Sequence, residues 1–199
     1  RRGRSIAGAC VHVQRTTHRG QRLCLVSSAS PLSLPVFLSF EGIDGSGKTT
    51  QAARLVERLR AAGYHVATVR EPGGTLLGEQ IRALLLDPAG DVTPRAELLL
   101  FSAARAQLVE RVIAPALAAG IIVVADRFFD STTAYQGYGR DVLDPEDADA
   151  FHALVTGGLA PDLTIVVDVD LATARSRRAS QVEDRIEAAD ETFHARVRD

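Results

Sequence analysis

The sequence predicts a doubly wound α/β domain, in which a parallel β-sheet carries helices on both faces, and three observations support this fold class. Four short segments are apolar throughout instead of alternating between apolar and polar residues, as expected of strands buried on both faces. Segments with helical periodicity separate these strands along the chain. The first apolar segment also leads directly into a glycine-rich turn and then a helix, an order common in this fold class.

The predicted elements follow one another from residue 36 onward. The predicted strands are 36–40, 65–69, 121–125 and 163–167, and the predicted helices are 49–62, 79–86 and 94–119. Gly63 and Gly120 follow the first and the long helix, where glycine closes a helix without a steric penalty. A polar, helix-like run follows at 191–198.

Residues 1–35 differ in composition from the rest of the chain. They contain six arginines, both cysteines (Cys10 and Cys24) and no acidic residue. This composition resembles that of an organellar transit peptide; the alternative is upstream sequence joined to the gene in error. The chain contains no Met, so we expect that it does not begin at an initiator residue. We expect residues 1–35 to be an extension outside the domain, and residues 36–199 to form the domain.

The composition of residues 36–199 excludes several classes of function. This part carries all 25 acidic residues against 17 basic ones, which argues against a broad nucleic-acid-binding face. It contains no cysteine, so a disulfide framework or a thiolate zinc site is excluded there. No apolar stretch approaches the roughly 20 residues that cross a bilayer, so we expect no membrane partner.

Residues 42–49, Gly-Ile-Asp-Gly-Ser-Gly-Lys-Thr, match the phosphate-binding loop pattern G-x-x-x-x-G-K-[ST] at every fixed position. The glycines let successive backbone N–H groups turn toward a phosphate at a helix N-terminus. Lys48 would reach the β- and γ-phosphates, and the Thr49 hydroxyl would ligate Mg²⁺. A chance match is the alternative, with odds of roughly one in a hundred. The strand before the motif and the helix after it favour a nucleotide site, and Lys48 is the only lysine of the chain.

The residues after the third predicted strand point to a kinase. The chain contains no asparagine, which excludes the N-K-x-D guanine reader of a GTPase switch. A motor ATPase usually has two acids here, but this strand ends in Asp126 followed by Arg127. Asp126 can serve the Mg²⁺ shell through water, and Arg127 is suited to hold a second anion. The alternative for Arg127 is a surface salt bridge.

Several further segments resemble bacterial thymidylate kinases. They are 40–42 (Phe-Glu-Gly), 70–75 (Arg-Glu-Pro-Gly-Gly-Thr), 100–105 (Leu-Phe-Ser-Ala-Ala-Arg), 126–127 (Asp-Arg), 131–137 (Ser-Thr-Thr-Ala-Tyr-Gln-Gly), 161–163 (Pro-Asp-Leu) and 184–187 (Asp-Arg-Ile-Glu). The resemblance runs from residue 36 to about residue 199, and the R-E-P-G-G and A-Y-Q-G segments are close to family-specific. It implies the fold of a P-loop nucleotide kinase and transfer of the γ-phosphoryl group of ATP to dTMP, with Mg²⁺, giving dTDP and ADP for dTTP biosynthesis.

The resemblance also implies roles for single residues. Phe101 and Arg105 share a helix face, and it implies that Phe101 stacks on the thymine ring while Arg105 donates to a base carbonyl. Taken alone, Phe101 would be a core residue and Arg105 a solvated charge. The implied donor set is Gly42, Ile43, Asp44, Gly45, Ser46, Gly47, Lys48, Thr49 and Thr50, with Thr49 and Asp126 at the metal. The implied acceptor set is Asp44, Arg70, Glu71, Pro72, Arg82, Phe101, Arg105, Arg127, Thr132, Tyr135 and Gln136, with Arg82 and Arg127 at the phosphate, Thr132 and Gln136 at the base edge and Tyr135 against the sugar 2′ position.

The catalytic arginine of the family lies either in the P-loop after the acid or in a mobile lid. Here Gly45 follows Asp44, so the resemblance implies a lid arginine, and the lid stretch offers Arg177, Arg178 and Arg185. The expected catalytic set is Lys48, Arg127, Arg178 and Arg185. Which lid arginine acts stays open.

Two rival functions and several wider questions stay open. The rivals are another P-loop kinase of nucleosides or small metabolites, and a catalytically silent nucleotide-binding module. The long helix 94–119 is apolar on more than one face, which fits a homodimer or a helix wedged inside one subunit; the resemblance favours the homodimer. We expect a cytoplasmic protein, organellar only if residues 1–35 are a genuine transit peptide. We also expect a further parallel strand and a closing helix beyond residue 199.

Overall fold

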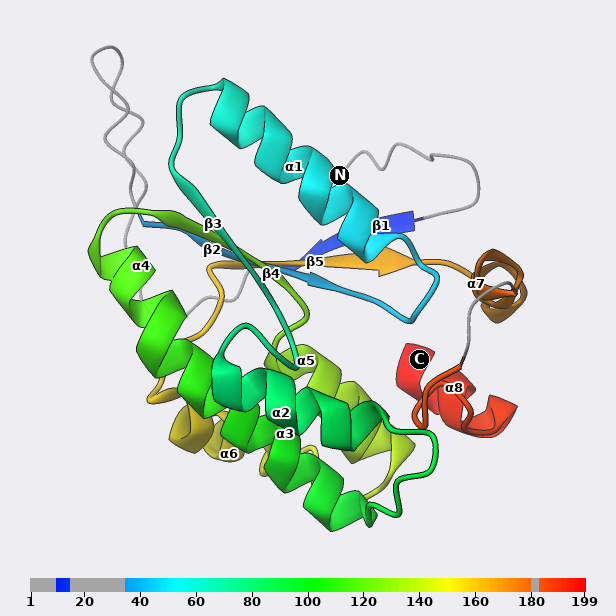
Figure 1. The fold of residues 1–199 in the computed structure, drawn as a ribbon. Coiled ribbons are helices and arrows are strands. Elements are labelled where there is room, and N and C mark those ends of the chain that lie inside the picture. The colour runs from blue at the N-terminus through cyan, green and yellow to red at the C-terminus, as the bar shows by residue number, and fades with distance from the viewer. Residues whose placement is uncertain (1–9, 15–34, 180–182) are drawn as a thin grey trace.

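The structure is a computed structural model that describes residues 10–14, 35–179 and 183–199. Its centre is a sheet with the strand order β1-β5-β2-β4-β3 (Figure 1). The strands are β1 (Cys10–Gln14), β2 (Phe37–Glu41), β3 (Val66–Arg70), β4 (Ile122–Asp126) and β5 (Leu163–Asp168). β2, β3, β4 and β5 are mutually parallel where they pair, so the four predicted strands and the parallel sheet are confirmed to within one residue at each end.

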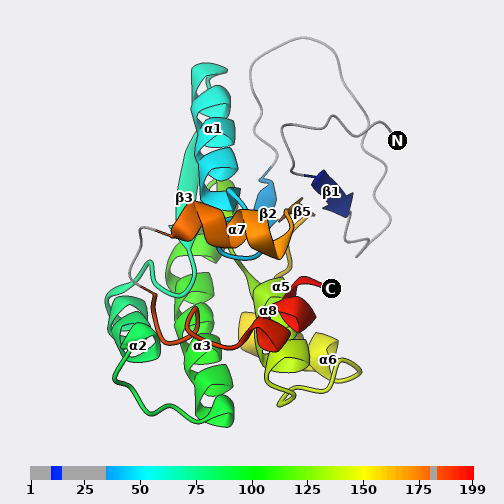
Figure 2. The same cartoon turned by 90° about the vertical axis from the view of Figure 1, so that its right-hand side faces the viewer.

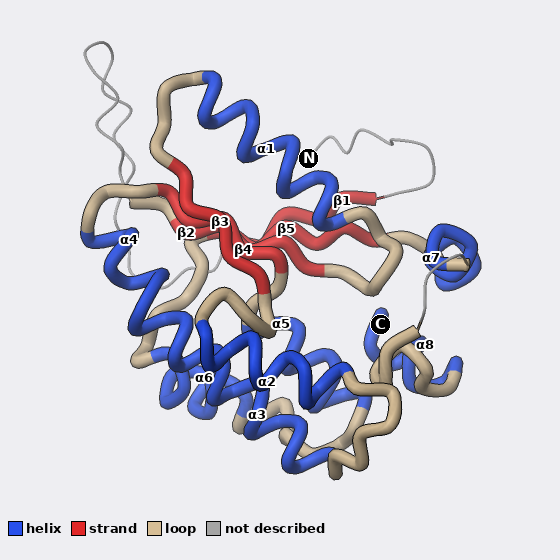
Figure 3. Tube along the Cα trace, viewed as in Figure 1, coloured by secondary structure: helices blue, strands red, loops and turns tan. Residues whose placement is uncertain are grey.

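Helices cover both faces of this sheet, as predicted (Figures 1 and 3). The helix α1 (Lys48–Ala61) lies on one face, and on the other a continuous run forms α3 (Pro94–Leu108), the π-helical turn η1 (Val109–Ile113) and α4 (Ala114–Ala118). The predicted helix 94–119 is therefore confirmed in extent, with a π-helical stretch at its middle.

The strand β4 shows why its sequence is apolar at every position. Ile122 and Val124 pack in the cluster that includes Val56 of α1, whereas Val123 and Ala125 pack in the cluster that includes Leu108 of α3 and residues of η1. Successive side chains of a strand point to opposite faces, so a strand between two helical layers needs apolar residues throughout.

The remaining helices surround the carboxyl ends of the strands. They are α2 (Leu76–Leu86), α5 (Phe129–Thr132), η2 (Thr133–Gly139), α6 (Ala148–Thr156), α7 (Leu171–Arg178) and α8 (Glu191–Arg198). The helix α8 packs against η2, and Figure 2 shows α7 crossing in front of the sheet. The helix α2 begins three residues before its predicted start, because Thr75 caps it: the Thr75 Oγ1 accepts a hydrogen bond from Gly78 N at 2.9 Å.

The strand β1 comes from the stretch 1–35, which we expected to lie outside the domain. Residues 1–35 carry no apolar period, yet Cys10–Gln14 pairs antiparallel with β5, from Cys10 opposite Asp168 to Gln14 opposite Thr164. Backbone pairing at a sheet edge needs unpaired N–H and C=O groups more than it needs an apolar face. β1 lies on the outer edge of β5, and the other residues of 1–34 lie outside the described part of the chain.

Within the described residues, every helix is too short or too polar to span a membrane.

Candidate active site

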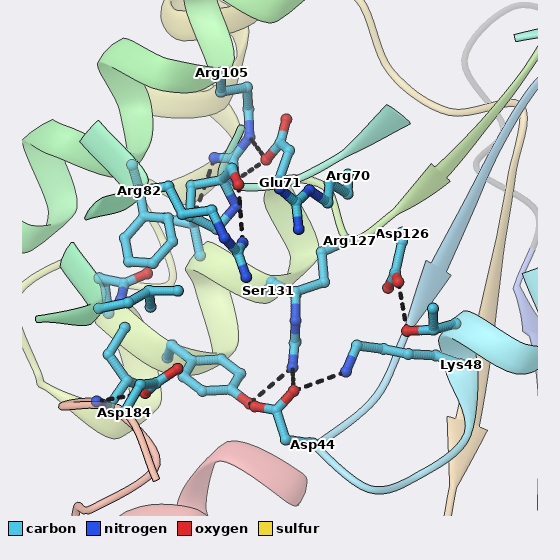
Figure 4. A pocket seen from close by; sticks show the side chains of 18 residues that line it. Asp44, Lys48, Arg70, Glu71, Arg82, Arg105, Asp126, Arg127, Ser131 and Asp184 are labelled. Atoms are coloured by element: carbon cyan, nitrogen blue, oxygen red, sulfur yellow. Dashed lines mark hydrogen bonds and ion pairs between the residues drawn. The ribbon is translucent and has the colours of Figure 1, made fainter. Parts of the chain in front are cut away.

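A cavity of about 270 Å³ opens at the carboxyl ends of β2, β3 and β4 (Figure 4). Its lining comes from segments far apart in the sequence: Asp44, Lys48, Thr49, Arg70, Glu71, Pro72, Arg82, Leu86, Phe101, Arg105, Asp126, Arg127, Ser131, Thr132, Tyr135, Gln136, Asp184 and Ile186. All eleven residues predicted to bind the acceptor are among them. Ligands of open α/β sheets bind at this edge, because the loops that follow parallel strands meet there.

The loop between β2 and α1 has the backbone that the P-loop pattern predicts. Gly42, Gly45 and Gly47 have φ values of 139°, 84° and 98°, which side-chain-bearing residues rarely adopt. A Cβ on Gly45 would lie 2.4 Å from the carbonyl oxygen of Ala174, so this position also lacks space for one. The loop leads into the N-terminus of α1, where free N–H groups can bind phosphate.

A carboxylate joins the two cations predicted to act on phosphate. Asp44 Oδ1 accepts hydrogen bonds from Lys48 Nζ at 3.0 Å and from Arg127 Nη2 at 2.7 Å (Figure 4). Burial alone would raise the pKa of Asp44, but Arg127 and Lys48 hold it well below its usual range. Asp44 is thus a fixed anion that keeps both cations at the floor of the cavity.

Arg127 is held from several sides. Its φ of 74° is in the left-handed region, which a non-glycine residue seldom occupies. Its Nη1 donates to Ser131 Oγ at 3.0 Å, and its guanidinium lies 5.1 Å from the centre of the Tyr135 ring. The side chain is only 14% exposed, so Arg127 is not the surface salt bridge that was the alternative.

Thr49 and Asp126 meet at the side of the P-loop. Thr49 Oγ1 donates to Asp126 Oδ2 at 2.5 Å, while the buried Asp126 Oδ1 has no hydrogen-bond partner among the described residues. A hydroxyl and a carboxylate with a free oxygen fit Mg²⁺, which is usually held by few protein ligands together with water and substrate phosphate. The residues present therefore fit the predicted metal.

Arg105 is buried and binds three other residues, so it is not a solvated helix charge. Its side chain is 1% exposed, and its Nη2 lies 2.6 Å from Glu71 Oε2 in an ion pair. Its Nη1 donates to Thr132 Oγ1 at 2.8 Å, and its Nη2 also donates to the carbonyl of Phe128 at 3.2 Å. Burial raises the pKa of Glu71, and Arg105 opposes that rise.

The base-edge candidates have defined orientations. Gln136 Nε2 donates to the buried Glu97 Oε1 at 2.9 Å, so the Gln136 carbonyl oxygen is the end left for a ligand. Phe101 is half-buried: it lines the cavity and also packs on the core. Arg82 donates to the carbonyl of Pro72 at 2.9 Å, and Arg70 pairs with Glu79 at 3.0 Å.

The three candidate lid arginines lie in different surroundings. Arg178 pairs with Glu187 at 3.2 Å, and Arg185 donates to Glu97 Oε2 at 2.6 Å, so neither guanidinium lies in the cavity. Arg177 instead donates to the P-loop carbonyls of Gly45 and Ser46, at 3.1 and 3.0 Å. The sequence named Arg177 only as one of three lid arginines, because the polar run gives no signal for the register of α7.

Two more side chains at the site carried no signal in the sequence beyond their place in family-like segments. They are Glu41, which is buried behind Arg127, and Ser131, which touches both. The hydrogen bond between Ser131 and Glu41 could not be predicted from the sequence, because it joins β2 to α5 only in the folded chain.

Comparisons with known proteins identify close relatives of this chain. The family model described as thymidylate kinase matches residues 40–199. A protein named thymidylate kinase from Deinococcus radiodurans is 51% identical over 168 residues, covering 84% of this chain and 81% of that protein. One of the same name from a Synechococcus strain is 54% identical over 168 residues, covering 81% and 77%. The crystal structure of thymidylate kinase from Ehrlichia chaffeensis matches with a TM-score of 0.64 and 44% identity, covering 72% of this chain and 81% of that one.

Proposed function

The chain belongs to the thymidylate kinase family and is a nucleoside monophosphate kinase, and from this premise we propose how its residues carry out the transfer from ATP to dTMP. The relatives share a name that specifies the acceptor, which sets aside the kinases of other metabolites. The observation that carries the assignment of residues is the Asp44 carboxylate between Lys48 and Arg127, because it joins the donor side of the cavity to the acceptor side.

On the donor side, we assign the triphosphate of ATP to the loop 42–50. The free N–H groups at the start of α1 bind the β-phosphate, and Lys48 bridges the β- and γ-phosphates. Burial lowers the pKa of Lys48, while Asp44 acts to keep it charged.

On the acceptor side, Arg127 and Arg82 hold the phosphate of dTMP. Arg127 is oriented by Asp44 and Ser131, and a guanidinium in a fixed orientation can bind two phosphate oxygens at once. Arg70 and Pro72 line the same side of the cavity. Tyr135, whose hydroxyl lies 3.3 Å from Asp44, crowds the sugar position.

Thymine is recognised by Phe101 stacking on its face and by polar groups at its edge. Glu97 takes the amide nitrogen of Gln136, so the Gln136 carbonyl oxygen is free to accept the N3–H of thymine. Arg105 and Thr132 present donors to the C4 carbonyl oxygen of thymine. Cytosine has no N3–H and carries an amino group in place of that carbonyl, so this set of groups favours thymine.

The reaction needs little proton transfer, because the attacking group is a phosphate oxygen. An oxygen of dTMP forms a bond to the γ-phosphorus of ATP as the bond from that phosphorus to the β-bridging oxygen breaks, giving dTDP and ADP. Lys48 and Arg127 neutralise the charge on the transferring group and align the two phosphates. Mg²⁺ bound near Thr49 and Asp126 would supply further neutralisation of the phosphate oxygens.

A lid arginine supplies the remaining positive charge. The contacts of Arg177 with the P-loop carbonyls favour Arg177 for this role in the present conformation. Arg178 and Arg185 remain candidates, but each would have to leave its carboxylate partner first.

We propose a homodimer that forms through the exposed leucines of α2 and α3. Leu76, Leu84 and Leu99 are 82%, 60% and 57% exposed, although the long helix also buries Leu98 and Ile113 inside one subunit. Apolar side chains exposed on neighbouring helices suit a subunit interface. We propose a cytoplasmic location, in keeping with the bacterial relatives, and an organellar one if residues 1–35 are a transit peptide.

Steady-state assays test this function. With ATP as donor, dTMP should give a higher kcat/KM than dUMP, dCMP, AMP or thymidine. Lys48→Ala should lower kcat by about 100-fold or more while leaving the fold intact, because its loss removes charge stabilisation at the phosphates. Equal rates for parent and Lys48→Ala would contradict the mechanism. Binding of ATP and dTMP without turnover would instead favour a silent nucleotide-binding module.

A further inference from the structure

A buried carboxylate lies directly behind the arginine that holds the acceptor phosphate. Glu41 ends β2, is 5% exposed and accepts hydrogen bonds from three donors. Ser39 Oγ and Phe128 N donate to its Oε1, at 2.8 and 2.6 Å. Ser131 Oγ donates to its Oε2 at 2.5 Å. A buried charge with this many donors has a defined position.

Two of these bonds lead to Arg127. The N–H of Phe128 belongs to the peptide that follows Arg127, where the backbone has the unusual φ of 74°. The hydroxyl of Ser131 accepts from Arg127 Nη1 at 3.0 Å while it donates to Glu41. One carboxylate therefore holds both the backbone and the side chain of Arg127, and Figure 4 shows that side chain pointing at Asp44.

Phe128 also connects to the base pocket. The carbonyl of Phe128 accepts from Arg105 Nη2 at 3.2 Å, so residue 128 is held at its N–H by Glu41 and at its C=O by Arg105. Left-handed backbone at a non-glycine residue is unfavourable and persists only where surrounding contacts enforce it. Glu41 and Arg105 are two buried groups that make such contacts here.

We propose that Glu41 is a positioning residue for phosphoryl transfer, which orients the Arg127 guanidinium toward the acceptor phosphate through Phe128 N and the Ser131 hydroxyl. This inference rests on the proposed role of Arg127. Glu41 itself does not touch the cavity that holds the substrate.

The charge state of Glu41 should make activity depend on pH, which a packing role alone would not do. Burial, together with Asp130, raises the pKa of Glu41 to about 7, against the opposing effect of Arg127. Asp168 of β5 and Arg198 of α8 line the small cavity next to Glu41, but they pair with each other at 3.0 Å. A neutral Glu41 cannot accept all three bonds through charged oxygens, so the hold on Arg127 weakens as the pH falls through about 7.

The test compares Glu41→Gln with Ser39→Ala in the full chain. Glutamine keeps the shape of Glu41 but presents an N–H group where Ser131 now donates, whereas Ser39→Ala removes a hydrogen bond to Glu41 that does not lead to Arg127. We expect Glu41→Gln to lower kcat/KM for dTMP by about tenfold or more. We expect KM for ATP to change little, and Ser39→Ala to resemble the parent protein. Ser131→Ala should reproduce the loss, and it applies the same test if Glu41→Gln melts early.

Two further measurements separate positioning from packing. In an Arg127→Ala background, Glu41→Gln should have no further effect beyond about twofold, because the residue it orients is absent. The ratio of parent to Glu41→Gln activity should fall toward one as the pH drops from 8 to 6, since the parent then also has a neutral side chain. The phosphate of dTMP titrates in both reactions and cancels in this ratio.

The outcomes separate the inference from the function on which it rests. Turnover of dTMP by the parent with equal effects of Glu41→Gln and Ser39→Ala would overturn the inference alone. Additive losses in the double variant, or a ratio independent of pH, would do the same. A parent that does not turn over dTMP would overturn the proposed function and this inference with it.

Discussion

Asp44 Oδ1 lies 2.7 Å from Arg127 Nη2, so an ion pair crosses the floor of the cavity from the P-loop to the end of β4. Lys48 contacts the same oxygen at 3.0 Å. The two cations that we assign to different substrates therefore share one anion. Substrate phosphates enter a site whose positive groups are already oriented, which reduces the reorganisation needed for transfer.

This arrangement predicts a selective effect of Arg127→Ala. Loss of a buried guanidinium that holds the acceptor and neutralises transferred charge should lower kcat/KM for dTMP by about 100-fold or more. KM for ATP should change by less than about threefold, because Lys48 and the P-loop remain. Initial rates with each substrate varied in turn measure both quantities. A rise confined to the KM for ATP would show that Arg127 acts on the donor.

Arg105→Ala should affect stability and selectivity together. Removal of Arg105 leaves Glu71 buried without its partner, which costs about 3–5 kcal/mol of unfolding free energy. The preference for dTMP over dCMP should fall by about tenfold or more, because the base loses a charged donor.

The double variant Arg105→Met/Glu71→Gln separates these two effects. Without a buried charge it should recover most of the unfolding free energy, but not the preference for dTMP. Urea unfolding and paired kcat/KM values measure the two properties. Recovery of selectivity in the double variant would show that Arg105 acts only through Glu71.

The strands and the P-loop could be predicted because their signals are local. Each strand is a run of apolar residues, and Gly45 and Gly47 stand at positions where the backbone has positive φ. The helices α5 and η2 gave no such signal, since residues 129–139 are short, mixed in polarity and shaped by contacts with α8 and α3.

The contacts that orient the site could not be predicted from the sequence, because they join residues far apart along the chain. Glu41 and Ser131 are 90 positions apart, and Arg105 and Glu71 are 34 apart. Residue types and spacings indicate which side chains suit phosphate or thymine, but not which of them already bind one another. The pairing of Arg105 with Glu71, and of Arg185 with Glu97, follows from how the helices pack on the sheet.

The lid arginines can be distinguished by parallel substitutions. If Arg177 acts on the transferring group, Arg177→Ala should lower kcat by about 100-fold with little change in the KM for dTMP. Arg178→Ala is the matched control, since it lies next along α7 and pairs with Glu187 instead of the P-loop. A larger loss of kcat in Arg178→Ala or Arg185→Ala would move the role to that residue and would require its carboxylate contact to open during turnover.

His152 should make the fold less stable at acidic pH. Its Nε2 contacts Thr133 Oγ1 at 2.8 Å, its ring stacks on Phe129, and burial together with Arg105 lowers its pKa to about 4. The unfolded chain binds a proton to this histidine below about pH 6.5 while the folded chain does not, so the unfolding free energy falls as the pH drops. Between pH 7.5 and 5 the contribution of His152 amounts to about 2 kcal/mol.

His152→Phe isolates this contribution. The ring is retained and cannot titrate, so the variant should lose about 2 kcal/mol less unfolding free energy than the parent over the same pH interval. Glu41 acts in the opposite direction, since its raised pKa favours the folded state as the pH falls, but it does so equally in both proteins. Urea unfolding at the two pH values gives the change in unfolding free energy for each protein. Equal changes in the two proteins would show that His152 is protonated in the folded state at the lower pH.

The strand β1 predicts that residues 1–34 contribute to stability without contributing to catalysis. Among the described residues, the lining of the active-site cavity includes none from β1 or β5, so deletion of 1–34 should leave kcat/KM for dTMP unchanged. The deletion would unpair the outer edge of β5, which removes interstrand hydrogen bonds and opens an edge for self-association. We expect the melting temperature to fall by about 2–8 °C, corresponding to about 1–2 kcal/mol.

The variant His12→Pro/Val13→Pro is the control for lost charge, because it breaks the backbone pairing and keeps all six arginines. It should melt at a temperature close to that of the deletion. If both variants melt with the parent and stay equally monodisperse, β1 does not pair with β5 in solution, and residues 1–35 are an extension outside the domain, as their composition predicts.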